Sequence, residues 1–293
     1  MNTTGIVTAI LAALLMGTVG IFSRVTGLEA EAFTFFRLTI GAGFMLLFLV
    51  ATSRLHLIWS PSSWPVLLNG AVLAGLFIFY VQAIEYTTMA NAVMLLYLAP
   101  PATAIYAHYF LGERLTRAST FLIALALVGF MMMMEFSIDF NGDGHHIKGI
   151  VFGLLSMCCY ATFILVNRVI DDSIHIYTRT FHQLLIGGLF MLPFSLLQWP
   201  VIPTHVWPWL AATGLIPGFL AILCAVIALS RLPAATFGTL AYFEPIAVIV
   251  FGWTLFNESL SLLQLGGCLL IILSGTLKTW SAVTIAATPC PPN

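Results

Sequence analysis

Long apolar runs, separated by short polar stretches, occupy almost the whole chain. A bilayer core about 30 Å thick is crossed by a helix of about 20 mainly apolar residues, and runs of this length recur ten times. We place them near residues 5–23, 33–52, 64–84, 89–111, 118–135, 149–168, 179–199, 207–229, 236–257 and 260–280. The pattern therefore predicts an all-α integral membrane protein with ten transmembrane helices.

The composition supports a lipid environment. Only 7% of the 293 residues are charged and 60% are hydrophobic, whereas about 25% of the residues in a soluble protein are charged. So few charges cannot cover a water-facing surface. The net charge of −1 provides no basic face for nucleic acid, which excludes that class of partner.

The positive charges predict the orientation of the chain. Ten spans place both termini on one side of the membrane, and seven of the ten Lys and Arg residues fall on that side. Because cytoplasmic loops carry an excess of Lys and Arg, we expect both termini in the cytoplasm.

The chain contains an internal repeat. Shifting the sequence by 145 residues superposes identical residues around the fourth and ninth spans, and a shift of 144 does so for the first and sixth. We therefore predict two five-helix halves, at 5–135 and 149–280, joined by a loop at 136–148 and followed by a disordered tail at 281–293. Since five is odd, the second half would be inverted relative to the first, an arrangement typical of transporters.

Prolines interrupt the fourth and ninth spans at matched positions. Pro100 and its neighbour Pro101 each remove a helical hydrogen bond, as does Pro245 in the second half. The carbonyls that lose their donors are tolerated at membrane depth only beside other helices, water or a ligand. Interrupted spans in corresponding positions indicate a binding site near the midplane. The alternative is that these prolines only bend helices to fit the bundle.

Polar side chains accompany the prolines. Tyr97 and Tyr242 each lie three residues before a proline, on the same helix face, and a tyrosine at this depth needs a partner for its hydroxyl. Glu244 is the one carboxylate placed in the interior of a span, since Glu135 stands at the very end of the fifth. There Glu244 could carry a proton or hold a substrate amine. Packing contacts for the tyrosines and a structural hydrogen bond for Glu244 are the alternatives.

Other polar residues of the spans are further candidates for the site. Arg37 could bind a substrate carboxylate through its two-pronged guanidinium, or could extend to the nearby outer surface. Asn69 and Tyr80 share one helix face, and Tyr160 shares another with Asn167. Each could instead be a hydrogen bond between helices.

Two carboxylates end the proline-containing spans. Glu113 and Glu258 stand just before the fifth and tenth helices, where a negative charge complements the positive helix N-terminus. We predict a structural role for both.

The sequence contains no complete motif for catalysis or metal binding. "DFNGDG" at 139–144 resembles a calcium loop, but Ile150 stands where a bidentate Glu is required. HExxH, GxSxG and Walker motifs are absent from the sequence, and the cysteines lack metal-ligand spacing. We expect neither an enzyme nor a cofactor or metal.

The ten spans, the paired prolines and the motifs "GERL" and "NESL" resemble the EamA-type branch of the drug/metabolite transporter superfamily. The chain as a whole is similar to the YddG group of inner-membrane exporters of aromatic and other amino acids. This resemblance implies two halves around a central cavity, alternating access, and a location in the bacterial inner membrane. It carries over to Pro100, Glu113, Pro245 and Glu258.

The sequence thus predicts a gradient-driven exporter of amino acids, working as a monomer on a small molecule within the lipid bilayer. Export of other metabolites or drugs, and a channel-like facilitator, are the alternatives. An intramembrane enzyme is a third alternative. It would need a nucleophile and a base within the spans, and the sequence shows no such pair.

Overall fold

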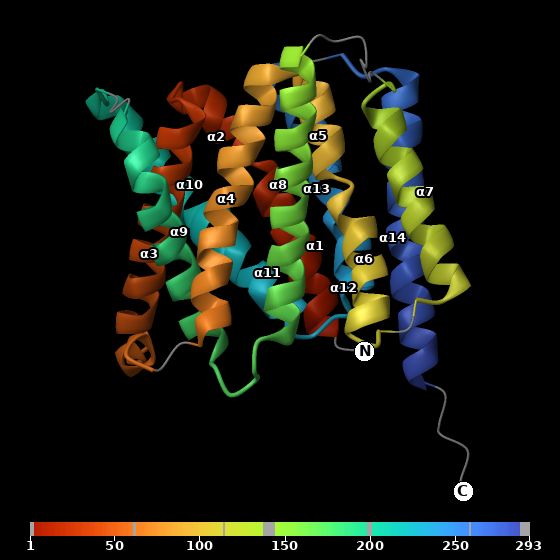
Figure 1. Ribbon diagram of the computed structural model, residues 1–293, viewed down its shortest axis with the longest axis horizontal. Coiled ribbons are helices and arrows are strands. Elements are labelled where there is room, and N and C mark those ends of the chain that lie inside the picture. Colours follow the sequence, from red (N-terminus) through yellow and green to blue (C-terminus); the bar gives the residue numbers. More distant parts are fainter. Residues whose placement is uncertain are drawn as a thin grey trace, which may run out of the picture.

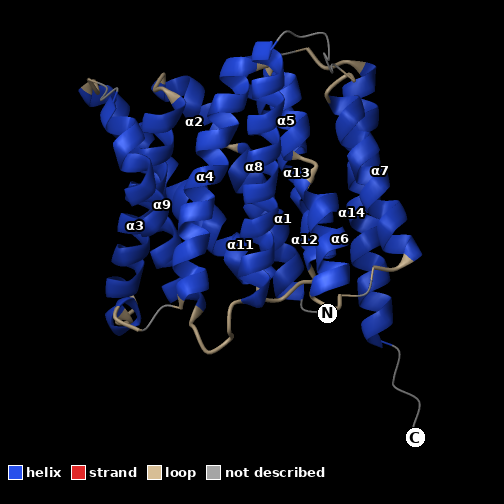
Figure 2. Ribbon diagram, in the orientation of Figure 1, coloured by secondary structure: helices blue, strands red, loops and turns tan. Residues whose placement is uncertain are grey.

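The computed structural model describes residues 3–60, 63–113, 115–136, 144–197, 201–257 and 259–287, and within them every regular element is helical (Figure 2). The α-helices are α1 Thr3–Gly17, α2 Val19–Thr26, α3 Ala30–Ala51, α4 Trp64–Tyr86, α5 Met89–Leu96, α6 Ala99–Phe110, α7 Arg117–Met133, α8 Gly144–Val169, α9 Ile176–Leu197, α10 Trp207–Thr213, α11 Ala221–Leu229, α12 Ala234–Ala241, α13 Phe243–Phe256 and α14 Leu262–Ala287. A π-helical stretch, Gly214–Leu220, joins α10 to α11.

The predicted spans correspond to these helices. Several spans are composite, because α1 continues into α2, α5 into α6, α10 through the π-helical stretch into α11, and α12 into α13. Within the described ranges, seven segments are long and apolar enough to cross a bilayer, and Arg117–Met133 and Leu262–Lys278 are shorter apolar helices. The all-helical membrane fold is confirmed.

Two predicted boundaries were wrong. Helix α8 begins at Gly144, so the end of the expected loop at 136–148 is helical. Helix α14 continues to Ala287, so residues 281–287 are helical and not a disordered tail. Residues 137–143, which hold most of "DFNGDG", and Glu258 lie outside the described residues.

The helices stand side by side as one bundle (Figure 1). Helix α1 begins, and α14 ends, at the same end of this bundle, whereas α8 begins at the opposite end. Large apolar side chains point outward along the helices, for example Leu47, Phe121 and Leu269, each more than 60% exposed. Such a surface suits lipid rather than water.

Small residues let the helices approach closely. A Cβ on Gly129 of α7 would lie 2.8 Å from the carbonyl oxygen of Gly267 in α14, so only glycine allows this contact. Close packing through small residues is the usual source of helix association in membranes. Side-chain caps define the starts of α5 and α7, because the hydroxyls of Thr88 and Thr116 accept hydrogen bonds from backbone N–H groups three residues later.

Candidate functional site

The two proline-containing spans break at matched positions and meet there. Helix α5 ends at Leu96 and α6 begins at Ala99, while α12 ends at Ala241 and α13 begins at Phe243. The hydroxyl of Tyr242 donates a 2.7 Å hydrogen bond to the carbonyl of Tyr97, 145 residues away. Pro101 leaves this carbonyl without its helical donor. A side chain of one half therefore satisfies a backbone group exposed by a proline of the other half.

Aromatic and small residues pack this crossing. The rings of Tyr97 and Phe130 lie 4.7 Å apart, and that of Tyr242 lies 5.9 Å from Tyr97. A Cβ on Gly238 of α12 would come 3.0 Å from that of Pro100, so the segments around the breaks are in close contact. Tyr242 is fully buried, as is Pro245. In this conformation, Tyr242 has the packing role that the sequence left as its alternative.

Glu244 lies in the first turn of α13, beside this crossing, and interacts with polar side chains from four other helices. Its carboxyl lies close to the hydroxyl of Tyr97. Its charge acts on the side chains of Arg37 in α3, Tyr80 in α4, Tyr97 at the end of α5 and Tyr160 in α8. Five residues predicted independently for a site are thus brought together; we call them the Glu244 cluster.

The members of this cluster differ in exposure. The side chains of Glu244, Tyr80 and Tyr160 are half-buried, whereas those of Arg37 and Tyr97 are buried. Charged and phenolic groups removed from water in this way need polar partners.

Arg37 is the buried cation of the cluster. Its side chain is 1% exposed, so the alternative that it extends to the outer surface is wrong. The guanidinium carbon lies 4.0 Å from the centre of the Phe77 ring, a cation–π contact. Nε and Nη2 are buried, and the described part of the chain gives them no hydrogen-bond partner. Gly218 of the π-helical stretch packs directly on the Arg37 carbonyl oxygen, where a Cβ would collide.

Asn69 lies in a different polar group. It is fully buried, and its amide donates to the carbonyl of Phe163 in α8 at 3.3 Å. Asn167 donates to the same carbonyl, and Gln183 of α9 donates to Asn167 at 2.8 Å. These amides join α4, α8 and α9, which is the role of hydrogen bonds between helices that the sequence offered as its alternative.

Glu113 holds together segments from both halves. One carboxylate oxygen lies 2.8 Å from Nε of Arg168 at the end of α8, and the other accepts a 2.8 Å hydrogen bond from the backbone N–H of Ala234. Ala234 begins α12, whose preceding Pro233 makes no side-chain cap. The carboxylate does complement a helix N-terminus, but the helix is α12 and not the expected α7. We call this contact the Glu113 latch.

A left-handed residue directs Glu113 into the latch. Gly112 has φ 67°, a conformation that glycine adopts without strain. Its repeat partner, 145 residues on, is Asn257 with φ 52°, and asparagine tolerates this region better than most residues. The backbone turn is thus the same in both halves, although "GER" of the first half is "NES" in the second.

The sequence analysis did not predict the latch, because the residues that form it are far apart along the chain. Glu113 and Ala234 are 121 residues apart, and Arg168 contacts the carboxylate across the halves. The one signal in the sequence was that Arg168 falls on Arg24 in the repeat alignment.

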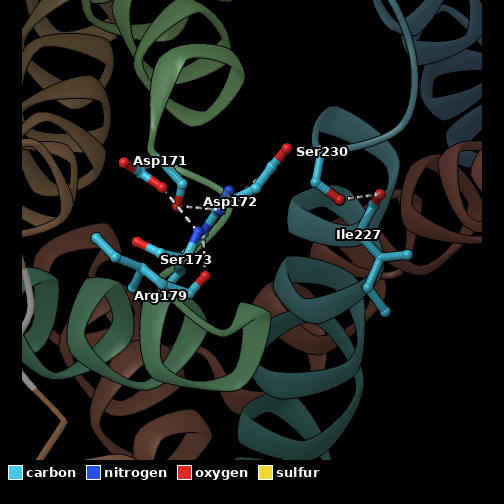
Figure 3. A network of polar contacts seen from close by, with 7 residues as sticks. Asp171, Asp172, Ser173, Arg179, Ile227 and Ser230 are labelled. Atoms are coloured by element: carbon cyan, nitrogen blue, oxygen red, sulfur yellow. Dashed lines mark hydrogen bonds and ion pairs between the residues drawn. The ribbon is translucent and has the colours of Figure 1, made fainter.

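A second polar network closes the loop between α8 and α9 (Figure 3). The guanidinium of Arg179 donates 2.7 Å and 3.5 Å hydrogen bonds to the carbonyl of Asp171 and the carboxylate of Asp172. The backbone N–H of Ser173 donates to the Asp171 carboxylate at 2.8 Å and holds the pKa of this carboxyl below its usual value. This network shapes a connection and does not reach the Glu244 cluster.

Two cavities have linings that contain no residue of the Glu244 cluster. One of about 150 Å³ borders the break between α5 and α6 and is lined by apolar side chains, including Leu98 and Phe130. Another of about 410 Å³ lies beside Tyr86 and Phe152. Neither is lined by Glu244 or Arg37, so the central cavity of the prediction stays a proposal.

An all-helical bundle with an apolar surface, interrupted spans and interior polar side chains defines a multi-pass membrane transporter. The EamA-like transporter family matches residues 3–135 and again residues 147–279. The chain belongs to this family. The two matches cover nearly all of the described helices.

Proteins with similar sequences are described as transporters or exporters. An uncharacterised transporter of Archaeoglobus fulgidus is 29% identical over 92% of this chain and 94% of its own length. The pseudopaline exporter CntI of Pseudomonas aeruginosa is 26% identical over 84% and 85%. The threonine/homoserine exporter RhtA of Escherichia coli is 28% identical over 69% and 66%. A crystal structure that is 20% identical superposes with a TM-score of 0.85 over 96% of this chain and 99% of that one, which shows the fold.

Proposed function

We propose that this protein is a gradient-driven transporter that exports amino acids across the bacterial inner membrane by alternating access. The observation that carries the proposal is the crossing of two interrupted helices, held by the Tyr242–Tyr97 hydrogen bond, next to the Glu244 cluster. Interrupted helices in corresponding positions are where transporters of repeated architecture bind substrate. Tyr80, Tyr97, Tyr160, Arg37 and Glu244 would contact the substrate in a central cavity, while Pro100, Pro245 and Tyr242 shape the crossing.

Movement would come from two inverted five-helix halves, at 5–135 and 149–280. Helices α1 and α8, which begin the halves, start at opposite ends of the bundle (Figure 1), as inversion requires. Rocking of one half against the other would expose the cluster to each side in turn. The excess of Lys and Arg on the terminal side supports cytoplasmic termini. A monomer contains both halves and needs no second chain for this motion.

Amino acids are the substrate class that the relatives and the site chemistry favour together. RhtA is a threonine/homoserine exporter, and the resemblance of the whole chain to the YddG group points to aromatic and other amino acids. The Glu244 cluster offers one cationic and one anionic group with three phenol rings. Such a lining suits a small polar molecule with an apolar or uncharged side chain.

The test is counterflow into proteoliposomes that contain the purified protein. Vesicles are preloaded with one of a panel of unlabelled amino acids, and uptake of a labelled one is measured with and without a pH gradient. Saturable exchange that requires internal amino acid is expected for this carrier. A non-saturable flux that ignores internal amino acid would indicate a channel-like facilitator, and lack of exchange across the panel would move the search to other metabolites or drugs.

A further inference from the structure

Arg37 and Glu244 carry opposite charges, act on each other, and yet are not joined. The charge of Glu244 reaches Arg37, but the described residues give Nε and Nη2 of Arg37 no hydrogen-bond partner. The carboxyl of Glu244 also lies close to the Tyr97 hydroxyl. Two opposite charges thus interact within the bundle without forming an ion pair.

Unpaired donors on a buried cation are rare, because removing them from water is costly when nothing replaces the lost hydrogen bonds. The Phe77 ring covers the guanidinium carbon but cannot accept the in-plane N–H groups. A carboxylate fits these groups, since its oxygens match the two-pronged guanidinium. Nothing in the described structure supplies that carboxylate.

A ligand with a single charge would pair with only one of the two charged side chains, Arg37 or Glu244. An isolated anion at Arg37 would repel the nearby Glu244 carboxylate, and an isolated cation at Glu244 would leave the Arg37 donors unpaired. A molecule that carries a carboxylate and an ammonium on neighbouring atoms satisfies both groups and adds no net charge to the interior.

We propose that Arg37 and Glu244 form the head-group site for a zwitterionic α-amino acid, with its carboxylate on Arg37 and its ammonium on Glu244. This assignment rests on the proposed transport function and specifies its substrate chemistry. The side chain of the amino acid then lies against Tyr80, Tyr97 and Tyr160, the half-buried and buried phenols around Glu244.

The assignment also links the two halves through the substrate. Arg37 lies in α3 of the first half, and Glu244 in α13 of the second. A bound zwitterion bridges them, whereas either charged group alone cannot. Movement of the loaded carrier is therefore favoured over movement of a half-loaded one, which predicts a preference for complete amino acids.

The experiment is competition in the counterflow assay. The labelled amino acid with the strongest exchange is competed by itself, by its N-acetyl derivative, which lacks the ammonium, and by its decarboxylated amine. Each derivative is expected to compete at least about tenfold more weakly than the amino acid, because each leaves one buried charged group unpaired. Equal competition by all three compounds, with saturable exchange intact, would overturn the head-group site and leave the transport function standing.

Charge-neutralising variants identify which group each residue binds. Arg37→Gln should remove the advantage of the amino acid over its amine and keep its advantage over the N-acetyl derivative. Glu244→Gln should do the reverse. A folding defect lowers all fluxes together and cannot invert these two preferences. Failure of the variants to separate them would refute the assignment, and absence of any amino-acid exchange in the parent protein would refute the proposed function and this site with it.

Discussion

The Glu113 latch predicts that Glu113→Gln weakens a contact between the two halves. The substitution keeps an oxygen that can accept from the Ala234 N–H, but it removes the charge that faces Arg168 at 2.8 Å. A hydrogen bond to a charged group contributes about 1.5–3 kcal/mol. The side chains of Arg168 and Glu113 are 35% and 16% exposed, so solvent screening lowers the expected loss to about 1 kcal/mol.

The assay is thermal unfolding of the detergent-purified protein in a double-mutant cycle with Arg168→Gln. A loss of 1 kcal/mol corresponds to a midpoint lower by about 2–4 °C in a protein of this size. Because each single change already breaks the pair, the double variant should be little less stable than either single variant. Glu85→Gln, which alters an exposed carboxylate, serves as the control and should leave the midpoint unchanged.

Additive effects would refute the reasoning. If the double variant loses the full sum of the single losses, Glu113 and Arg168 act independently and the latch is not a unit. Gly5 at the start of α1 packs against Leu232, two residues before α12, so the latch at the start of α12 lies toward the end of the bundle where α1 begins. A coupled pair would therefore also bias the carrier toward closure at that end, which the proposed topology places in the cytoplasm.

Three further substitutions test the crossing, the turn and the loop. Tyr242→Phe leaves the Tyr97 carbonyl without its donor and should cost about 1–3 kcal/mol of stability, measured by thermal unfolding; an unchanged midpoint would show that another group satisfies this carbonyl. Gly112→Ala forces a side chain onto a backbone with φ 67° and should cost about 1–2 kcal/mol, whereas Gly20→Ala, with no atom within 4 Å of the added Cβ, should be close to neutral; equal effects would contradict the strain. Asp171→Asn should lower the midpoint slightly at pH 7, because the folded state depresses the pKa of this carboxyl, so its stabilisation is present above the ordinary Asp pKa of about 3.9 and is lost as pH falls through the lower folded value. The difference from the parent protein should therefore vanish in acid, and a difference that grows there would reverse the sign of the argument.

The spans could be predicted because the bilayer sets their length. Runs of about 20 apolar residues located α3, α4 and α9 within a few residues of their observed bounds. The breaks beside Pro100 and Pro245 were also predictable, since proline removes a helical hydrogen bond whatever its surroundings.

Contacts between spans could not be read from the pattern in the same way. Arg37 lies early in its helix, where a long side chain could point to water or to the interior, and only the position of Phe77 and the π-helical stretch decides for burial. Tyr97 and Tyr242 were both predicted to face a substrate. The sequence did not reveal that the hydroxyl of one would satisfy a backbone carbonyl of the other.

Accessibility of the Glu244 cluster from the two sides of the membrane tests the central claim most directly. In a variant without the five native cysteines, Tyr160→Cys places a thiol at a half-buried position of the cluster, and Met45→Cys provides a fully buried control. A membrane-impermeant thiol reagent is applied to either face of oriented vesicles. Alternating access predicts that Tyr160→Cys reacts from both faces, that a transported amino acid changes the balance between them, and that the control stays unreactive. Labelling from a single face whether or not an amino acid is present would contradict the account.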